Sequence, residues 1–315
     1  MLAAGYRASA KRALALAGWL SEAVATFENA GIPVIVLKGP ALALTLYPDP
    51  ALRPSFDLDV LVRPSDLRRT LDVLSGEGYA PAPHLARFSE RTLLRLDSEV
   101  VLHHPRRTSI DLHWEIAPAD YPFRIDPDFL WRSHEAVQVA GRSVPVLTRE
   151  CLLVYLAAHA AKHAWRRLLW LSDVARLLDA PLDWAAATRL AAESDCAPIV
   201  RVALLLAAEL LGAPVPADAL AAARNDVPAA RVAADVSKRL RRLPPYTPSI
   251  IEATALNARL ATGLRAKARH WAALLVTPKD NDLARWRLPD RLLWLYKPLR
   301  MQRLIREYGR KFVGI

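Results

Sequence analysis

The chain has 315 residues, of which 53% are hydrophobic, and its formal net charge is +11. This length suits about two domains on the rough scale of 100 to 200 residues each, and the composition excludes a mainly disordered protein. Its two cysteines, Cys151 and Cys196, have no CxxC spacing. Neither a disulfide framework nor a zinc knuckle is therefore predicted, and a reducing cytoplasm is the expected location.

The N-terminal segment contains an apolar stretch, residues 13–20, behind a few basic residues. That stretch has about the minimum length of a signal-peptide core. The helical spacing of Leu16, Leu20 and Val24 continues past it through polar residues, so we expect an amphipathic helix that stays in the mature protein. No apolar run reaches the roughly 18 residues of a membrane span, and no transmembrane segment is expected.

The next segment predicts a buried strand followed by a helix. Residues 34–37 are apolar and mostly β-branched, and Pro40 stands where the first turn of a helix tolerates proline. Lys38 and Gly39 then lie on the turn between the two elements. Because a helix N-terminus presents free N–H groups and partial positive charge, this turn suits a phosphate group.

A second strand is predicted over residues 56–62, and its only polar members are Asp57 and Asp59. Side chains two residues apart on a strand share one face, so the two carboxylates project together. A pair of acids within an apolar strand is costly unless a cation lies between them. Magnesium, or manganese in its place, is the expected cation because it prefers oxygen ligands and substrate phosphates.

Two further strands are predicted between about residues 93 and 116, joined near Pro105. In the second of them Asp111 shares one face with His113 and Glu115, whereas Trp114 faces the core. A third carboxylate from a neighbouring strand completes a site for one or two metal ions that clamp an in-line phosphoryl displacement. His113 is expected to order Asp111 by a hydrogen bond or to contact substrate.

From residue 148 onward the pattern becomes helical, and the fold class expected is α+β: a mixed sheet with flanking helices over 1–147, followed by an all-helical domain over 148–315 that closes the cleft. Six helices are predicted, over residues 149–164, 166–180, 184–194, 198–212, 217–224 and 229–242. The last 51 residues hold 13 Lys and Arg against 4 Asp and Glu. This excess predicts either a surface for phosphates, RNA or an anionic membrane, or simply a solvated helical face.

A basic motif lies early in the helical half. His159, Lys162, His163 and Arg166 have the spacing of one helical stripe, with Trp170 and Asp173 nearly in line. The stripe is predicted to contact NTP phosphates or the acceptor, the alternative being neutralisation by Asp173 at the domain junction. A zinc site on the two histidines is disfavoured, since Ala160 replaces the glutamate that a metalloprotease helix needs.

Several motifs occur together at characteristic separations along the chain. They are Leu37-Lys-Gly39, Tyr47-Pro48, Arg53-Pro54, Asp57-Leu-Asp-Val-Leu-Val62, Gly78-Tyr79, Ile110-Asp-Leu-His-Trp114, His159-Ala-Ala-Lys-His163 and Trp170-Leu-Ser-Asp173. The combination resembles the uncharacterised nucleotidyltransferase family of bacterial peptide and polysaccharide biosynthesis clusters, within the DNA polymerase beta superfamily. The resemblance implies a polymerase-beta-like catalytic domain, with Asp57 and Asp59 as the metal pair and Asp111 as the third acid, which helps to activate the acceptor.

The resemblance also implies where the nucleotide binds. The predicted nucleotide-binding residues are Lys38, Gly39, Arg53, Lys162 and His163, and the predicted substrate or supporting residues are His113, His159, Arg166 and Asp173. The superfamily usually has Gly-Ser at the phosphate turn, so Lys38 here replaces a hydroxyl by a charge. Arg53 is expected to pair with Asp57 or a phosphate, or else to be an exposed loop arginine.

The activity implied is transfer of NMP from an NTP to an unknown acceptor, a peptide, saccharide or small molecule, with release of pyrophosphate. A toxin-like transferase acting on tRNA is an alternative that the basic C-terminal region favours. A catalytically degenerate binding or scaffold protein is the other. A phosphotransferase is disfavoured because the chain has neither a Walker A sequence nor a kinase-type glycine-rich loop.

Overall fold

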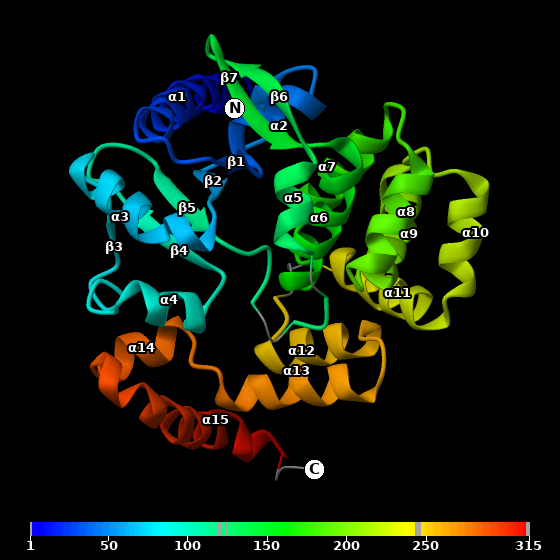
Figure 1. Ribbon diagram of the computed structural model, residues 1–315. Helices are drawn as coiled ribbons and strands as arrows, with labels where there is room; N and C mark the ends of the chain where they lie inside the picture. The colour runs from blue at the N-terminus through cyan, green and yellow to red at the C-terminus, as the bar shows by residue number, and fades with distance from the viewer. Residues whose placement is uncertain (1, 119–120, 124, 243–246, 313–315) are drawn as a thin grey trace.

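A computed structural model describes residues 2–118, 121–123, 125–242 and 247–312 (Figure 1). Its centre is a seven-stranded mixed sheet in the order β3-β4-β5-β2-β1-β7-β6. The strands are β1 (Ile35–Val36), β2 (Asp57–Leu61), β3 (Ala80–Pro81), β4 (Glu99–His103), β5 (Ser109–His113), β6 (His134–Val139) and β7 (Arg142–Leu147). With the helices that follow, this confirms the predicted α+β class.

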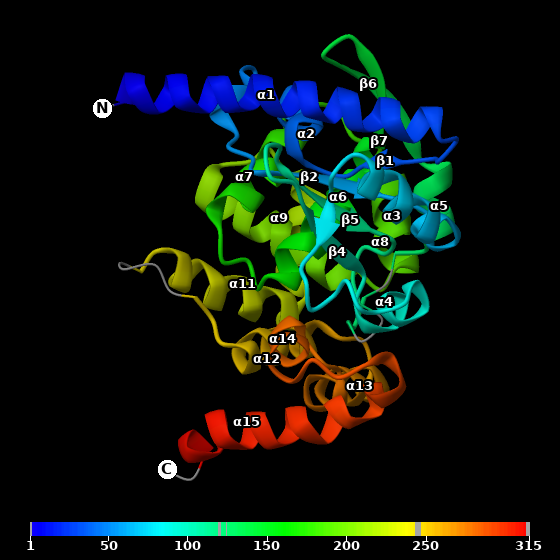
Figure 2. The ribbon, with the colours of Figure 1, turned by 90° about the vertical axis from the view of Figure 1, so that its left-hand side faces the viewer.

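One face of the sheet is covered by helix α1 (Leu2–Asn29), which lies along the top of the molecule in Figure 2. Leu58 and Val60 of β2 are fully buried there together with Leu20 and Phe27 of α1. The alternation of β2 therefore sends Asp57, Asp59 and Leu61 to the opposite face. Leu61 belongs to a different cluster of buried side chains, which also includes residues of the helices that follow the sheet.

Short helices connect the strands of the first half. They are α2 (Gly39–Leu46), η1 (Pro50–Leu52), η2 (Pro64–Asp66), α3 (Leu67–Gly76), α4 (Glu90–Leu96) and α5 (Pro127–Arg132). Pro40 stands in the first turn of α2, as expected. The prediction of strand from residue 93 was wrong at its start, because residues 93–96 end α4, where Leu93 and Leu96 turn into the core.

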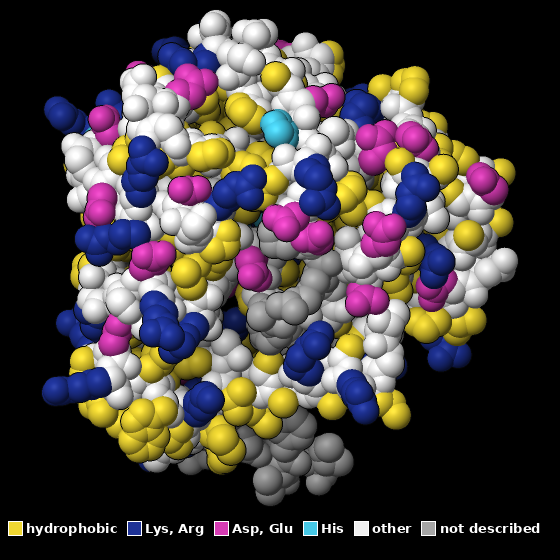
Figure 3. Space-filling model, in the orientation of Figure 1, with side chains coloured by type: hydrophobic (Ala, Val, Ile, Leu, Met, Phe, Trp, Pro, Cys, Tyr) yellow, Lys and Arg dark blue, Asp and Glu magenta, His cyan; other side chains and the backbone are white. Residues whose placement is uncertain are grey.

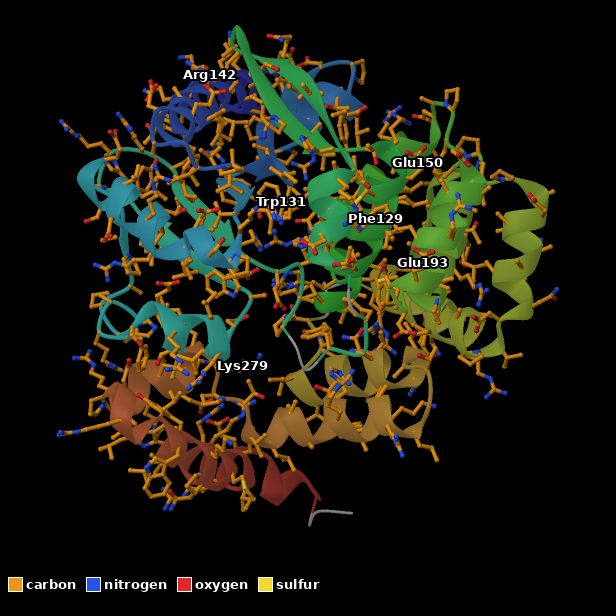
Figure 4. All side chains as sticks on the ribbon, viewed as in Figure 1. Phe129, Trp131, Arg142, Glu150, Glu193 and Lys279 are labelled. Carbon is orange, nitrogen blue, oxygen red and sulfur yellow. The ribbon has the colours of Figure 1, made fainter. Side chains whose placement is uncertain are left out.

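The hairpin of β6 and β7 was missed by the sequence analysis. Its two-residue loop is Ala140-Gly141, with positive φ values of 48° and 79°, and Arg142 follows at the start of β7. Alanine at the first of these positions conceals the turn, since Asn-Gly or Asp-Gly is the usual signal. Arg142 fixes the hairpin to α1 through an ion pair of 2.5 Å with Glu28 (Figure 4).

The second half is helical, and the six predicted helices are present with shifts of a few residues at their ends. They are α6 (Arg149–Lys162), α7 (Leu168–Leu178), α8 (Trp184–Glu193), α9 (Ala197–Leu211), α10 (Ala217–Asn225) and α11 (Val227–Leu240). Since β7 ends at Leu147 and α6 begins at Arg149, the change of architecture falls beside the predicted domain boundary. Buried side chains of α6 share one core cluster with Ile35 and Leu37 around β1.

The remaining elements lie below the sheet in both ribbon views. They are α12 (Ile250–Leu260), α13 (Leu264–Val276), α14 (Asp280–Trp286), η3 (Asp290–Leu295) and α15 (Tyr296–Phe312). A buried ion pair of 2.5 Å between Arg300 and Asp282 ties α15 to α14. Within the described residues, no helix is both long and apolar enough to cross a membrane.

Candidate active site

The pairing of β2 with β5 brings the predicted carboxylates together. The two strands run parallel, with Asp59 opposite Asp111 and Asp57 opposite Ser109. Residues that face each other across a strand pair project to the same side, so all three acids lie on one face of the sheet. The sequence predicted a third acid on a neighbouring strand, and the register places it directly beside Asp59.

The turn between β1 and α2 lies next to these acids. Gly39 has a φ of +69°, and a Cβ on it would lie 3.2 Å from the carbonyl oxygen of Asp57. Glycine is therefore required here for two reasons: the backbone has a positive φ, and β2 approaches too closely for a side chain. The Lys38 side chain extends from this turn to β2, where its Nζ lies 2.8 Å from Oδ1 of Asp59.

His113 does not take the first of its two predicted roles, ordering Asp111, and its contact with substrate stays a prediction. Its Nε2 lies 3.3 Å from Oδ1 of Asp59 and its Nδ1 lies 3.0 Å from Oε2 of Glu99, so it bridges these two acids and does not order Asp111. Lys162 pairs with the same Glu99 oxygen at 2.6 Å. The network runs from β2 to the end of α6 and includes Glu99, which the sequence analysis missed.

Arg53 is buried, and its partner is Asp173. Its Nε and one terminal nitrogen lie 2.8 and 2.9 Å from the two carboxylate oxygens, and the Tyr47 hydroxyl donates to the same carboxylate at 2.8 Å. The other terminal nitrogen donates to Ser55 Oγ at 2.7 Å. Neither the predicted pairing with Asp57 nor an exposed loop position is found. Asp173 likewise neutralises Arg53 and not the basic stripe, because α7 directs it toward the η1 segment.

The basic stripe is not continuous. Helix α6 ends at Lys162, and Ala164 and Trp165 follow with positive φ values of 54° and 48°, which break the helix before Arg166. The rings of His159, His163 and Trp170 pack against one another with centroids 4.8 to 5.2 Å apart. The guanidinium groups of Arg166 and Arg167 lie 5.8 and 5.7 Å from the Trp170 ring.

These groups surround one cavity of about 270 Å³. Ten of the twelve predicted site residues line it: Lys38, Gly39, Arg53, Asp57, Asp59, Asp111, His113, His159, His163 and Arg166. The other two stand behind its wall, Lys162 on Glu99 and Asp173 on Arg53. Residues not predicted to be in the site are Ser55, Phe56, Glu99, Arg167 and Leu169.

The carboxylates of the cavity differ in how well they are neutralised. Burial alone would raise the pKa of Asp59, but Lys38 and His113 hold that pKa below its ordinary range. Burial, and then the charge of Asp59, raises the pKa of Asp57. Burial, and then the charges of Asp59 and Asp57, raises the pKa of Asp111 to about 7. Asp57 and Asp111 thus keep their protons to higher pH than an exposed aspartate does.

The histidines divide into one cation and two neutral rings. Burial acts to lower the pKa of His113, but Glu99 and Asp59 outweigh it and raise that pKa to about 9. Burial, together with Lys38, holds the pKa of His159 well below its ordinary value. Burial, together with Lys162, lowers the pKa of His163 to about 3. At neutral pH the stripe therefore presents two uncharged imidazoles beside Trp170 rather than a run of positive charge.

The donor set is compatible with a hard divalent cation. Among the residues that the structure describes, neither Asp57 nor Asp111 has a basic side chain within ion-pair distance, and no three His, Cys, Asp or Glu side chains close around one point. Magnesium commonly takes one or two carboxylates and completes its shell with water and substrate phosphates. Two of the three carboxylates of Asp57, Asp59 and Asp111 would suffice to hold it, with water and phosphate oxygens completing the shell.

The charge of His113 makes the stability of the metal-free protein depend on pH. Its pKa is about 9 in the folded chain and about 6.5 in an unfolded one. This contribution is fully present below pH 6.5 and is lost as the pH rises to 9, an effect on the order of 3 kcal/mol. We expect the urea midpoint of the wild type to fall across this range and that of His113→Gln to change much less. A variant of the exposed His103, His103→Gln, is the control; an unchanged pH dependence in His113→Gln contradicts the assignment.

Comparison with known proteins gives the following findings. A family model described as uncharacterised nucleotidyltransferase matches residues 1–212. No curated protein matches. Among solved structures, an antigenic nucleotidyltransferase-like protein from Paracoccidioides brasiliensis is 13% identical, with a TM-score of 0.37 over 57% of this chain and 86% of that one. Similarity at this level supports no inference about this chain. The family model covers more than half of the chain, including the three carboxylates and the cavity around them, and the protein therefore belongs to the uncharacterised nucleotidyltransferase family.

Proposed function

We propose that the protein is a metal-dependent nucleotidyltransferase that transfers NMP from an NTP to a hydroxyl-bearing peptide, saccharide or small molecule and releases pyrophosphate. The observation that carries this proposal is the register of β2 and β5, which sets Asp59 beside Asp111 and Asp57 on the same face. A carboxylate cluster beside a positively charged turn suits binding of a triphosphate together with a divalent cation. The same proposal includes a catalytic domain over 1–147 and membership of the polymerase beta superfamily. It also includes a cytoplasmic location and a role in bacterial biosynthesis clusters.

In the proposed reaction an acceptor oxygen attacks the α-phosphorus of the NTP, a new P–O bond forms, and the bond to the β-phosphate oxygen breaks as pyrophosphate leaves. Magnesium held by these carboxylates would supply positive charge to neutralise the phosphate oxygens. Asp111 is the group that takes the hydroxyl proton. Asp111 lies directly across from Asp59 on the sheet face that carries the carboxylates, and a carboxylate in that position can accept the proton.

The triphosphate is proposed to lie against the turn at Lys38 and Gly39. The first N–H groups of α2 and the ammonium group of Lys38 are the donors there. Arg166 and Arg167 line the same cavity and are exposed, and among the described residues neither has an acidic partner. Two unpaired guanidinium groups facing a carboxylate cluster are well placed to bind phosphate oxygens.

Arg53 and Lys162 are assigned positioning roles. Arg53 binds Asp173 through two nitrogens and also lies 3.4 Å from the carbonyl oxygen of Gly39, so it steadies the phosphate turn from behind. Lys162 holds Glu99, and Glu99 in turn holds His113 against Asp59. Both cations are already paired, which makes direct phosphate binding a lesser role for them.

Substitution of Asp111 tests the chemical step. We expect Asp111→Asn to reduce transfer about 10²- to 10⁴-fold, the range typical of a lost general base. The measurement is transfer of label from each of four α-³²P-labelled NTPs into products in a metabolite extract, together with pyrophosphate release. Asp72→Asn, an exposed aspartate of α3 paired with Arg68, is the matched control. Undiminished transfer in Asp111→Asn excludes Asp111 as the base, and no transfer by the wild type with any NTP supports the degenerate binding protein.

Substitution of Gly39 tests the phosphate turn. Gly39→Ala puts a side chain at a φ of +69° and 3.2 Å from the Asp57 carbonyl oxygen. A strain of about 1–3 kcal/mol at such a position is expected to weaken nucleotide binding roughly tenfold or more. Gly18→Ala on α1 is the control, since its Cβ would meet nothing within 4 Å. Equal nucleotide affinity in Gly39→Ala and wild type, by calorimetry, would remove this turn from the binding site.

A further inference from the structure

The C-terminal helix α15 is amphipathic, with one face packed on the protein. Tyr296, Arg300 and Leu304 are buried on this inner face. Arg300 donates to Asp282 of α14 at 2.5 Å and to the carbonyl oxygen of Leu274 in α13 at 2.9 Å. The inner face is thus held in place by charge and hydrogen bonds as well as by apolar contact.

The outer face of the same helix is also apolar, although it contacts solvent. Trp294 is 63% exposed, Met301 43% and Ile305 67%, and Pro298 is exposed between them. The spacing of three and four residues places Pro298, Met301 and Ile305 on one stripe of α15, on a different side from the buried positions. Trp294 belongs to η3, directly before this stripe. Figure 3 shows hydrophobic side chains gathered at the lower left of the molecule, over α15, with Lys and Arg side chains around them. A stripe of large apolar side chains on an outermost helix marks an interaction surface.

Positive charge lies on both sides of this stripe. Arg291, Lys297 and Arg306 are exposed and, within the described part of the chain, none of them has an acidic partner. The nearby acids are engaged elsewhere. Asp282 binds Arg300 and Arg303, and Asp290 accepts hydrogen bonds from Ser89. The outer face of α15 therefore combines apolar tips with unneutralised cations.

We propose that the outer face of α15, defined by Pro298, Met301 and Ile305 together with Trp294 of η3 and the flanking cations, docks on an anionic lipid surface. An apolar stripe bordered by Lys and Arg is the pattern that lies in the interface of a bilayer, where the cations meet anionic headgroups. Charge complementarity favours anionic over neutral lipid. Trp294 is the one aromatic side chain of this face, and Pro298, Met301 and Ile305 offer neither stacking surfaces nor hydrogen bonds to nucleic acid, which favours lipid over RNA. This proposal is independent of the proposed transferase activity.

The test is sedimentation of the full chain with phosphatidylcholine vesicles that contain about one third phosphatidylglycerol, the anionic component. We expect binding to these vesicles, and at least about tenfold weaker binding to pure phosphatidylcholine or at high salt. The variant Met301→Glu/Ile305→Glu is expected to lose binding at least about tenfold, because its charges oppose both insertion and the anionic surface. Lys297→Glu/Arg306→Glu should lose the preference for anionic vesicles.

Matched controls come from α1, at the opposite end of the molecule in Figures 1 and 2. Leu14 is 75% exposed and Lys11 is also exposed. Leu14→Glu therefore replaces an exposed apolar side chain by a charge, and Lys11→Glu reverses an exposed positive charge, as the α15 variants do. Both are expected to bind vesicles as the wild type does. All variants change exposed side chains, and circular dichroism checks that each is folded.

Three results would overturn the proposal. The first is equal vesicle binding by the wild type and Met301→Glu/Ile305→Glu. The second is no vesicle binding together with tRNA binding that Lys297→Glu/Arg306→Glu abolishes, which would make the face a nucleic-acid surface. The third is no vesicle binding together with a dimer in gel filtration that Met301→Glu/Ile305→Glu converts to a monomer, which would make the face an interface between two copies.

Discussion

Repulsion among three carboxylates on one sheet face is the constraint around which the site is arranged. The parallel register of β2 and β5 places Asp59 beside Asp111, and Leu58, Val60, Ile110 and Leu112 bury the opposite face of the same strands. The strands cannot slip by one residue without moving the acids into the core and the apolar residues out of it. The register is therefore fixed by hydrophobic burial, and the carboxylates must be tolerated where that burial puts them.

The surrounding cations offset the repulsion among these carboxylates only in part. Lys38 and His113 neutralise Asp59, and Lys162 and His113 neutralise Glu99, but Asp57 and Asp111 stay without such partners among the described residues. The pair of Arg53 and Asp173 sits behind this layer and links the loop before β2 to α7. Removing one member of such a buried pair costs about 3–5 kcal/mol, because the other charge is left uncompensated. The pair thus holds in place the part of the cavity wall that contains Lys38 and Gly39.

The sequence was informative wherever residue type and spacing act locally. The alternation of Asp57, Leu58 and Asp59 predicted which face carries the acids, and Gly39 before Pro40 predicted the turn into α2. Long-range partners were not predictable from spacing. Arg53 and Asp173 are 120 positions apart, and His113 binds Glu99 on β4, a residue that carries no motif of its own. A helix break near residue 165 was predicted, but the basic stripe was extended across it to Arg166 as if on one helix. The positive φ values of Ala164 and Trp165, which neither residue type favours, end α6 before Arg166. Protonation was equally hidden, since burial and nearby lysine leave His159 and His163 neutral.

The central claim is that Asp57, Asp59 and Asp111 hold a divalent cation together with a nucleotide. The most direct measurement is the melting temperature of wild type and Asp57→Asn with ATP, GTP, CTP or UTP, each with and without magnesium. A ligand at about 100 times its dissociation constant adds about 2.7 kcal/mol of stability, which is readily seen as a shift in melting temperature. The account predicts a magnesium-dependent shift with at least one nucleotide in the wild type and none in Asp57→Asn. The same shift in both proteins, or none in the folded wild type with any nucleotide, would contradict it.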